Sequence, residues 1–349
     1  MIISFSYPST HRYGGGVDTL FSYADGLARR GHTVHLIHGP AIPDLISSPD
    51  DISWHRFEPA ITHHVVASLA DPSLPAADVI FQPDAPPHLG QPVVLIQGYK
   101  LLAAALERPA FRAACPKVCV AGWLTRVGQA WGSPPEQLLH VPPGIDHQHF
   151  RPAGAATERP IDVAMLYTDH PVKGGADGLA ALDLVRRRRP DLRVVLFGML
   201  PPGELPPWAT FRQAPDHETL AAEIYGCAKV FLQPSWREGF GLTAVEAMAC
   251  GAALVTTDNG GSEDYARPGF TAEVAPPRDP ASLAAAIERL LDDDAHRGNV
   301  ARAGEDLAAT FTWDHAAELL EDHLERYLAD PAALQRPPSD APMFLEDSW

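Results

Sequence analysis

Short apolar segments alternate with longer segments of helical periodicity along most of this 349-residue chain. The first such unit runs from the apolar segment 2–7, through glycines at 14–16 and a helically spaced apolar stripe, to a second apolar segment at 33–37. Gly31, which follows the stripe, is a residue typical of helix ends. Strand, glycine loop, helix and strand in this order predict a βαβ unit with parallel strands.

The same alternation continues in two series. Further strands are expected at 78–82, 93–97, 117–121, 161–167, 193–198, 230–234 and 253–257. Residues 151–160 separate the two series; they are rich in Pro, Ala and Gly and have no periodicity, which is typical of a linker. We therefore predict an α/β protein of two doubly wound, Rossmann-like domains that face each other across a cleft, with ligands at the carboxyl ends of the strands.

The linker and the elements near the C-terminus define the predicted domain boundaries. Residues 1–150 are expected to form the N-terminal domain and residues 161–312 the C-terminal domain. A last helix is expected over 313–330. The tail at 331–349 contains several prolines and is expected to be poorly ordered.

Acidic side chains outnumber basic ones, with 44 Asp and Glu against 27 Lys and Arg and a formal net charge of −17. Nucleic acids and anionic membranes bind basic surfaces, so neither is an expected partner. The N-terminal residues lack the pattern of a signal peptide, and no apolar run reaches the roughly 20 residues of a membrane span, so a cytoplasmic protein is expected. The four cysteines and sixteen histidines match no metal-ligand spacing, so no metal site is expected.

The stretch that says most about chemistry is Ser235–Cys250, with the sequence SWREGFGLTAVEAMAC. Glu238 follows a predicted strand, and Glu246 lies on the predicted helix after it, with seven residues between the two. An ionised carboxylate accepts hydrogen bonds from hydroxyl groups. Two carboxylates at this end of a strand therefore suit a ligand rich in hydroxyls.

The residues between these carboxylates favour a phosphate. Gly239 and Gly241 allow the backbone to approach a ligand closely. The amides of Leu242 and Thr243 open the helix and can bind an anion, which the helix dipole favours. Hydroxyls together with phosphate indicate a sugar nucleotide. The alternative is an ordinary glycine turn before a helix, with the second carboxylate facing solvent.

This stretch resembles the Glu-x7-Glu signature of the retaining glycosyltransferases of family 4, which have the two-domain GT-B fold. Other segments that resemble the family, in the same order, are Gly14–Gly16, 29–34, Val141–Asp146, Lys173-Gly174, 257–263 and 311–313. The resemblance covers about residues 1–330. It implies that a sugar moves from a nucleotide-diphosphate sugar to a small soluble acceptor, in specialised-metabolite or glycoconjugate biosynthesis, without a cofactor or a metal. It also implies that the final helix packs back on the N-terminal domain.

The resemblance implies a role for individual residues as well. Glu246 would hold the ribose hydroxyls of the donor, Glu238 would face the donor sugar, and Lys173 would neutralise the diphosphate leaving group. Backbone contacts to the sugar and the phosphates would come from Gly15, Gly16, Gly239, Phe240, Gly241, Leu242 and Thr243.

Two positions depart from the family pattern. Members usually have an arginine six residues before the lysine, where this chain has Tyr167, a donor-site residue that brings a hydrogen bond but no charge. Many have a histidine at the end of the strand 93–97, where this chain has Gln97. Glutamine is no general base near neutral pH. Gln97 is therefore expected to orient the acceptor or a sugar hydroxyl, while the leaving phosphate takes the acceptor proton.

Two other functions stay open. Tyr167 and Gln97 are compatible with a non-catalytic protein that binds a sugar nucleotide without turning it over. A sugar-nucleotide epimerase of the GT-B type would form product from the donor alone. A dehydrogenase is disfavoured because the first strand is followed by HRYGGG and not by a spaced G-x-G-x-x-G. Acceptor choice is expected to depend on the loops at 40–75 and 98–112.

Overall fold

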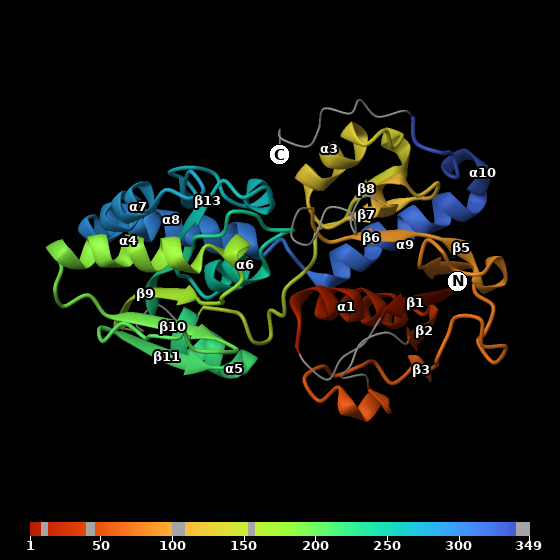
Figure 1. Ribbon diagram of the computed structural model, residues 1–349, viewed down its shortest axis with the longest axis horizontal. Coiled ribbons are helices and arrows are strands. Elements are labelled where there is room, and N and C mark those ends of the chain that lie inside the picture. Colours follow the sequence, from red (N-terminus) through yellow and green to blue (C-terminus); the bar gives the residue numbers. More distant parts are fainter. Residues whose placement is uncertain (8–12, 40–45, 100–108, 153–157, 340–349) are drawn as a thin grey trace. The chain divides into compact units, whose positions relative to one another are not determined.

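The computed structural model describes residues 1–7, 13–39, 46–99, 109–152 and 158–339. The chain divides into two compact units, each with parallel sheets and a hydrophobic core of its own (Figure 1). The first unit consists of Met1–Gly144 and Trp313–Trp349, and the second of Ile145–Thr312. Parts of the predicted linker, of the loop before the first glycines and of the two acceptor loops lie outside the described residues.

The boundary after the first series of strands lies at Gly144, not at residue 150 as predicted. Ile145 forms a bridge with Thr312, which closes the second unit at its two ends. Phe150 is 2% exposed and packs on Tyr225 of the second unit, with 6.0 Å between the ring centroids. Residues 145–150 therefore belong to the second unit, with the apolar side chains of Ile145 and Phe150 buried.

The first unit contains a five-stranded parallel sheet in the order β3-β2-β1-β4-β5 and a three-stranded parallel sheet in the order β6-β7-β8. Its strands are β1 (Ile2–Tyr7), β2 (Thr33–His38), β3 (Thr62–Val65), β4 (Val79–Phe81), β5 (Gln91–Pro92), β6 (Val94–Ile96), β7 (Lys117–Cys119) and β8 (Leu138–His140). β5 pairs with β4, and β6, two residues later, pairs with β7. A single stretch of chain therefore links the two sheets.

The helices of the first unit include one from the far end of the chain. They are α1 (Gly15–Arg29), α3 (Gly122–Ala130), α9 (Trp313–Ala329) and α10 (Pro331–Leu334). α9 packs against α1, and its apolar stripe of Ala316, Ala317, Leu320 and Leu324 is buried. A Cβ added at Gly26 of α1 would lie 2.7 Å from the Cβ of Ala317, so the two helices are in close contact.

The tail beyond α9 differs from the prediction. α10 continues the helical structure, and the Gln335 side chain donates a 2.8 Å hydrogen bond to the Tyr327 hydroxyl. The amide of Ser339 donates to the carbonyl of Gly132 at 2.9 Å. Residues 331–339 are therefore held against the first unit by hydrogen bonds that composition does not reveal, while residues 340–349 lie outside the described part.

The second unit is built on one six-stranded parallel sheet in the order β11-β10-β9-β12-β13-β14. Its strands are β9 (Ile161–Leu166), β10 (Val194–Gly198), β11 (Ala209–Gln213), β12 (Ala228–Gln233), β13 (Ala253–Thr257) and β14 (Ala272–Ala275). Its helices are α4 (Gly175–Arg188), α5 (His217–Thr219), α6 (Leu242–Ala249), α7 (Pro280–Asp292) and α8 (Asp294–Ala308). Residues 220–225 continue α5 as a π-helical turn.

The order of these strands places a topological switch at the centre of the sheet. From β9 the chain moves outward through β10 to β11, and it then returns to β12 on the other side of β9. α4 and α7 lie together along one face of the sheet (Figure 1). Because the connections leave β9 and β12 in opposite directions, a crevice opens between the loops that follow these two strands.

Candidate functional site

The two loops at the switch point carry the charged residues singled out in the sequence. The loop after β9 contains a 3-10 turn, Pro171–Lys173, and the loop after β12 contains Glu238. A backbone hydrogen bond of 2.7 Å from the amide of Trp236 to the carbonyl of Val172 joins the loops. Lys173 and Glu238 are thus brought together although 65 residues separate them.

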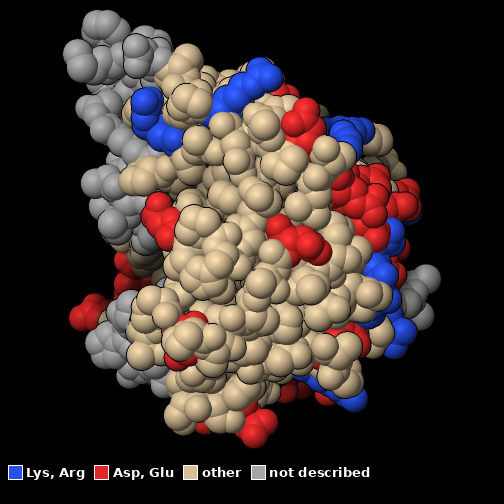
Figure 2. Space-filling view, turned by 90° about the vertical axis from the view of Figure 1, so that its right-hand side faces the viewer, with Lys and Arg blue, Asp and Glu red and all other residues tan. Residues whose placement is uncertain are grey.

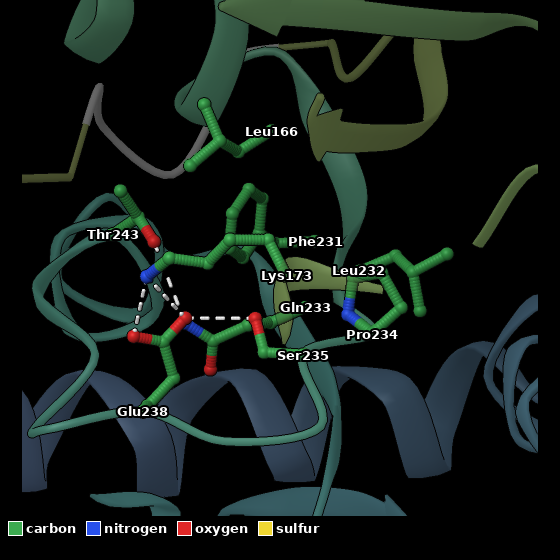
Figure 3. Close-up of a pocket in the computed structure, with 9 residues that line it drawn as sticks. All are labelled: Leu166, Lys173, Phe231, Leu232, Gln233, Pro234, Ser235, Glu238 and Thr243. Atoms are coloured by element: carbon green, nitrogen blue, oxygen red, sulfur yellow. Dashed lines mark hydrogen bonds and ion pairs between the residues drawn. The ribbon is translucent and has the colours of Figure 1, made fainter. Parts of the chain in front are cut away.

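Lys173 and Glu238 form an ion pair in which the Lys173 Nζ lies 2.9 Å and 2.7 Å from the two carboxylate oxygens (Figure 3). The Glu238 side chain is 8% exposed and that of Lys173 is 34% exposed. Ser235 donates from its hydroxyl to the same carboxylate at 2.7 Å. The carboxylate is therefore held inside the protein by two donors, and the ammonium group faces the open side.

The turn that presents Lys173 depends on the glycine after it. Gly174 has a φ of +64°, in the left-handed region that favours glycine. A Cβ at this position would lie 2.0 Å from the carbonyl oxygen of Pro234, in the loop after β12. Only glycine therefore allows the two loops to approach this closely.

A pocket lies beside the ion pair. It contains about 230 Å³ of empty space, part of it open to solvent. Figure 3 shows the side chains around it. The pocket is lined by Leu166, Lys173, Phe231, Leu232, Gln233, Pro234, Ser235, Glu238 and Thr243.

The N-terminus of α6 provides the third part of the site. Gly241 precedes the helix with a φ of +107°, and a Cβ there would lie 2.3 Å from the buried Tyr265 hydroxyl. No side chain caps this helix end. The first amides of α6, at Leu242 and Thr243, lie where the helix dipole favours an anion. An oxyanion is therefore the ligand chemistry that suits this end of the helix.

Phe240 and Gly239, two further predicted residues of the signature, have different surroundings. The Phe240 ring is buried, 5.5 Å from that of Tyr265 and 5.3 Å from that of Phe311, so only its backbone can contact a ligand. Gly239 lies between it and Glu238, next to the bridge that Glu238 forms with Gly260. The loop is thus fastened on its inner side by packing and backbone pairing.

Glu246 lies within α6 and is 7% exposed. Its carboxylate accepts a 3.2 Å hydrogen bond from the Tyr225 hydroxyl. A solvent-facing position, the alternative weighed for this residue, is therefore wrong. The hydrogen bond from the buried Tyr225 hydroxyl holds one of its carboxylate oxygens in place.

Tyr167 follows β9, where its hydroxyl donates to the Asp169 carboxylate at 2.9 Å. Partial burial and the neighbouring Asp169 carboxylate raise the pKa of the phenol. Tyr167 is not among the side chains that line the pocket. Tyr167, which was predicted to contact the sugar donor, therefore lies beside the pocket, and its hydroxyl is hydrogen-bonded to Asp169.

The predicted residues of the first unit form a group of their own. Gly15 and Gly16 begin α1, and the Gln97 side chain donates a 2.8 Å hydrogen bond to the carbonyl of Gly16. A Cβ at Gly16 would lie 2.4 Å from the Gln97 amide oxygen, whereas one at Gly15 would meet nothing within 4 Å. Gln97 can therefore pack against the glycine loop because Gly16 has no side chain.

Several polar residues near the site were not predicted. Ser235 donates to Glu238, and its neighbour Trp236 donates from the indole to Asp177 of α4 at 2.5 Å. The Arg278 guanidinium lies 4.1 Å from the centre of the Trp236 ring. The positions of Ser235 and Trp236, shortly before Glu238 in the sequence, could have indicated that they lie near the site. The contacts of Trp236 to α4 and to residue 278 depend on tertiary structure.

On the face shown in Figure 2, Lys and Arg lie near the rim, mixed with Asp and Glu, and the centre is mostly uncharged. Among the described residues, no helix is both long and apolar enough to cross a bilayer. The same residues contain no cluster of three or more His, Cys, Asp or Glu side chains arranged to hold a metal ion.

Known proteins are similar to this chain in sequence over part of its length and in fold over nearly all of it. Residues 146–307, nearly all of the second unit, match the family model of glycosyl transferases group 1. D-inositol 3-phosphate glycosyltransferases are similar in sequence: that of Geodermatophilus obscurus is 32% identical over 54% of this chain, and that of Segniliparus rotundus 31% over 57%. The aligned parts are 47% and 48% of those relatives, so the chain spans about half the length of the curated relatives it matches.

Solved structures are similar over nearly all of the chain. Anabaena Alr3699/HepE in complex with UDP-glucose has a TM-score of 0.73 and 16% identity, covering 93% of this chain and 100% of that one. Sucrose-phosphate synthase from Thermosynechococcus elongatus has a TM-score of 0.71 and 19% identity, covering 94% and 99%. These likenesses show the fold: the chain consists of two Rossmann-like domains of the GT-B type, as predicted.

Proposed function

We propose that this protein is a glycosyltransferase that moves a sugar from a nucleoside-diphosphate sugar to a small acceptor. The observation that carries the proposal is the Lys173–Glu238 ion pair, set beside the uncapped N-terminus of α6 at the switch point of the sheet. Cation and helix amides suit a diphosphate, and the carboxylate suits sugar hydroxyls. The UDP-glucose bound by a structural neighbour has this chemistry.

The proposed roles assign each part of the donor to one part of the site. The Lys173 ammonium and the amides of Leu242 and Thr243 bind the diphosphate, and Glu246 binds the ribose hydroxyls. Glu238 exchanges its bond to the ammonium for hydrogen bonds from the sugar. A pre-placed donor to charge that develops on the leaving group contributes about 3–4 kcal/mol to transition-state stabilisation. Lys173 is the residue that supplies such a charge from within the pocket.

The proposed reaction retains the configuration of the sugar and needs no metal. Gln97 cannot take a proton near neutral pH, so the leaving phosphate takes the proton of the acceptor. In this proposal Gln97 and the glycine loop at Gly15 and Gly16 orient the reacting groups from the first unit. The acceptor is proposed to be a small polyhydroxylated molecule, because the relatives in sequence are named for D-inositol 3-phosphate.

Nucleotide binding and sugar transfer can be tested separately. The melting temperature of the protein is measured with UDP, GDP, dTDP and ADP. A nucleotide present at 100 times its dissociation constant stabilises by about 2.7 kcal/mol, which raises the midpoint by several degrees. One nucleotide should stabilise the wild type, and the same nucleotide should stabilise Glu246→Ala much less.

Transfer is then assayed with the sugar nucleotides of the base that binds, against a panel of small polyols including inositol 3-phosphate. We expect Glu238→Ala to bind nucleotide, to melt as a folded protein and to lose transfer. Unchanged turnover in Glu238→Ala would contradict the proposed role of that carboxylate. Product formed in the absence of any acceptor would instead identify an epimerase, and binding without turnover a non-catalytic protein.

A further inference from the structure

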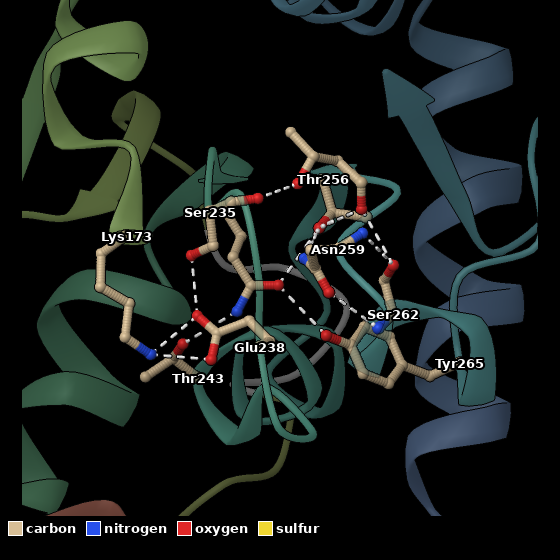
Figure 4. A network of polar contacts seen from close by, with 10 residues as sticks. Lys173, Ser235, Glu238, Thr243, Thr256, Asn259, Ser262 and Tyr265 are labelled. Atoms are coloured by element: carbon tan, nitrogen blue, oxygen red, sulfur yellow. Dashed lines mark hydrogen bonds and ion pairs between the residues drawn. The ribbon is translucent and has the colours of Figure 1, made fainter. Parts of the chain in front are cut away.

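A buried network of polar side chains leads to the pocket, and its members Thr256, Asn259, Gln233 and Tyr265 have no role assigned above. It runs from the loop after β13, through Thr256 at the end of that strand, to Gln233 at the end of β12 (Figure 4). Gln233 is 4% exposed, Asn259 2% and Thr256 0%. Polar groups buried this deeply need hydrogen-bond partners, so the direction of each bond in the network has consequences for the next.

The direction of the network is set by a backbone amide, which can only donate. The amide of Ser262 lies 2.9 Å from the side-chain oxygen of Asn259. The Asn259 oxygen is therefore the acceptor, and its NH₂ group is the atom that faces the Thr256 hydroxyl at 3.2 Å. Because the Thr256 oxygen accepts from Asn259, its own proton is free to be donated, and the Gln233 oxygen at 3.1 Å is a nearer acceptor than the carbonyl of Thr257 at 3.4 Å.

The Gln233 amide is oriented by this chain of bonds. Its oxygen accepts from Thr256 and, at 3.1 Å, from the Tyr265 hydroxyl. Tyr265 is fully buried, and burial together with the Glu238 and Asp264 carboxylates raises the pKa of its phenol, so the phenol keeps its proton and donates. Two hydroxyl donors on the oxygen leave the NH₂ group turned toward the Thr243 hydroxyl, 3.4 Å away.

The network ends at the pocket. The Thr243 oxygen accepts from Gln233, so the Thr243 hydroxyl proton is left to donate elsewhere. Within the described part of the chain no protein atom accepts it. Thr243 lies on the first turn of α6 and lines the same pocket as Lys173 (Figure 3). A ligand oxygen bound at the N-terminus of α6 would accept the hydrogen bond from the Thr243 hydroxyl.

We propose that Gln233 is a positioning residue: with Thr256 and Asn259 it orients the Thr243 hydroxyl as a hydrogen-bond donor to a phosphate oxygen of a nucleoside diphosphate. This inference rests on the proposed function, because the ligand is the diphosphate of the proposed sugar donor. The reverse orientation of the Gln233 amide would set its NH₂ against two donating hydroxyls. The orientation with the Gln233 oxygen toward both hydroxyls is therefore the one that satisfies both donors.

The test measures nucleotide affinity by calorimetry, using UDP, GDP, dTDP and ADP with the full-length protein. Thr243→Val removes the hydroxyl at nearly constant volume, and Thr243→Ser keeps it. A hydrogen bond to a charged group is worth about 1.5–3 kcal/mol, so Thr243→Val should bind at least about tenfold more weakly. Thr243→Ser restores the hydroxyl, so it should recover most of the affinity that Thr243→Val loses.

Gln233→Met removes the orienting amide at similar size, and it should weaken binding to a similar degree. In the double variant Gln233→Met/Thr243→Val, binding should be no weaker than in Thr243→Val alone, because the amide acts only through the hydroxyl. Thr256→Val, with Thr256→Ser as its control, interrupts the network one bond further from the ligand. It keeps the proposal testable if Gln233→Met does not fold.

The outcomes separate the two proposals. If the wild type binds one of the nucleotides and the effects of Gln233→Met and Thr243→Val add, the positioning role is wrong and the proposed function is untouched. Equal binding of that nucleotide by Thr243→Val and the wild type would also overturn the positioning role alone. If the wild type binds none of the four nucleotides, the proposed function fails, and the positioning role fails with it.

Discussion

The Lys173 ammonium and the Glu238 carboxylate neutralise each other across 2.7 Å at the site. A diphosphate at the N-terminus of α6 would compete with Glu238 for the same ammonium. The carboxylate therefore has two opposed effects in the proposed function: it binds the sugar of an intact donor, and it opposes the binding of a bare nucleoside diphosphate. A substitution that keeps its shape and removes its charge separates these effects.

We expect Glu238→Gln to bind the nucleoside diphosphate as tightly as the wild type or a few-fold more tightly, because Lys173 no longer has a competing anion. Turnover should fall by about 100-fold or more, the usual cost of removing one preorganised polar contact from an active site. Calorimetry and a transfer assay on the same preparation check both effects. Weaker binding of the diphosphate by Glu238→Gln would show that Glu238 supports the phosphates and does not compete with them.

At the scale of a single element, the side chain of His55 contacts two carboxylates of helix α1. The two nitrogens of His55 lie 2.9 Å from a carboxylate oxygen of Asp18 and 2.7 Å from one of Asp25, both on α1. Burial lowers the pKa of His55, but the two carboxylates outweigh burial and raise it to about 9. The helix that begins with Gly15 and Gly16 is therefore held by a cationic histidine from a neighbouring loop.

The pH dependence of the free energy of unfolding should reveal the contribution of His55 and its two carboxylate partners. His55 has a folded-state pKa above its unfolded value of about 6.5, so its contribution is complete below pH 6.5 and is lost as pH rises through about 9. The expected loss is roughly 1–3 kcal/mol. Urea unfolding of the wild type and His55→Gln at pH 6 and pH 9.5 measures it, because their difference cancels the other titrating groups. A difference that does not change with pH would show that His55 is not charged in the fold.

At the scale of the whole molecule, the chain passes twice between the units. It leaves the first unit after Gly144 and returns to it at Trp313, so that α9 completes the first core from the far end of the sequence. Leu320 of α9 is fully buried in that core, and Ile287 of α7 is fully buried in the other. Each residue therefore reports on the unit in which it is packed.

Leu320→Ala should destabilise the first unit by about 2–5 kcal/mol, because it leaves a cavity in a packed core. Hydrogen exchange should quicken in β1 and β2 and stay unchanged in β9 and β12. Ile287→Ala is the matched control and should give the reverse pattern. Equal loss of protection in both units, for either variant, would show that the two units unfold as one cooperative system.

Periodicity and the arrangement of loops made much of the fold predictable. Four strands of the second unit, β9, β10, β12 and β13, were expected within a few residues of their observed bounds, whereas β11 and β14 were not predicted. α9 was expected over nearly its whole length. The error at residue 150 has a physical cause: the Pro- and Gly-rich segment 151–160 follows Phe150, whose burial against Tyr225 no local pattern reveals. The hydrogen bond from the tail amide of Ser339 to the carbonyl of Gly132 is equally non-local.

The candidate site divides in the same way. The sequence by itself determined that Lys173 and Glu238 follow strands and that Thr243 opens a helix, because chain periodicity and glycine position decide local structure. It did not determine that the first two form an ion pair, or that Gln233, read only as part of a strand, meets Thr243 and Tyr265. Hydrogen bonds depend on atomic positions to within a few tenths of an ångström. Such positions exist only once the sheet has brought distant loops together, so the tertiary structure alone decided which polar groups face one another.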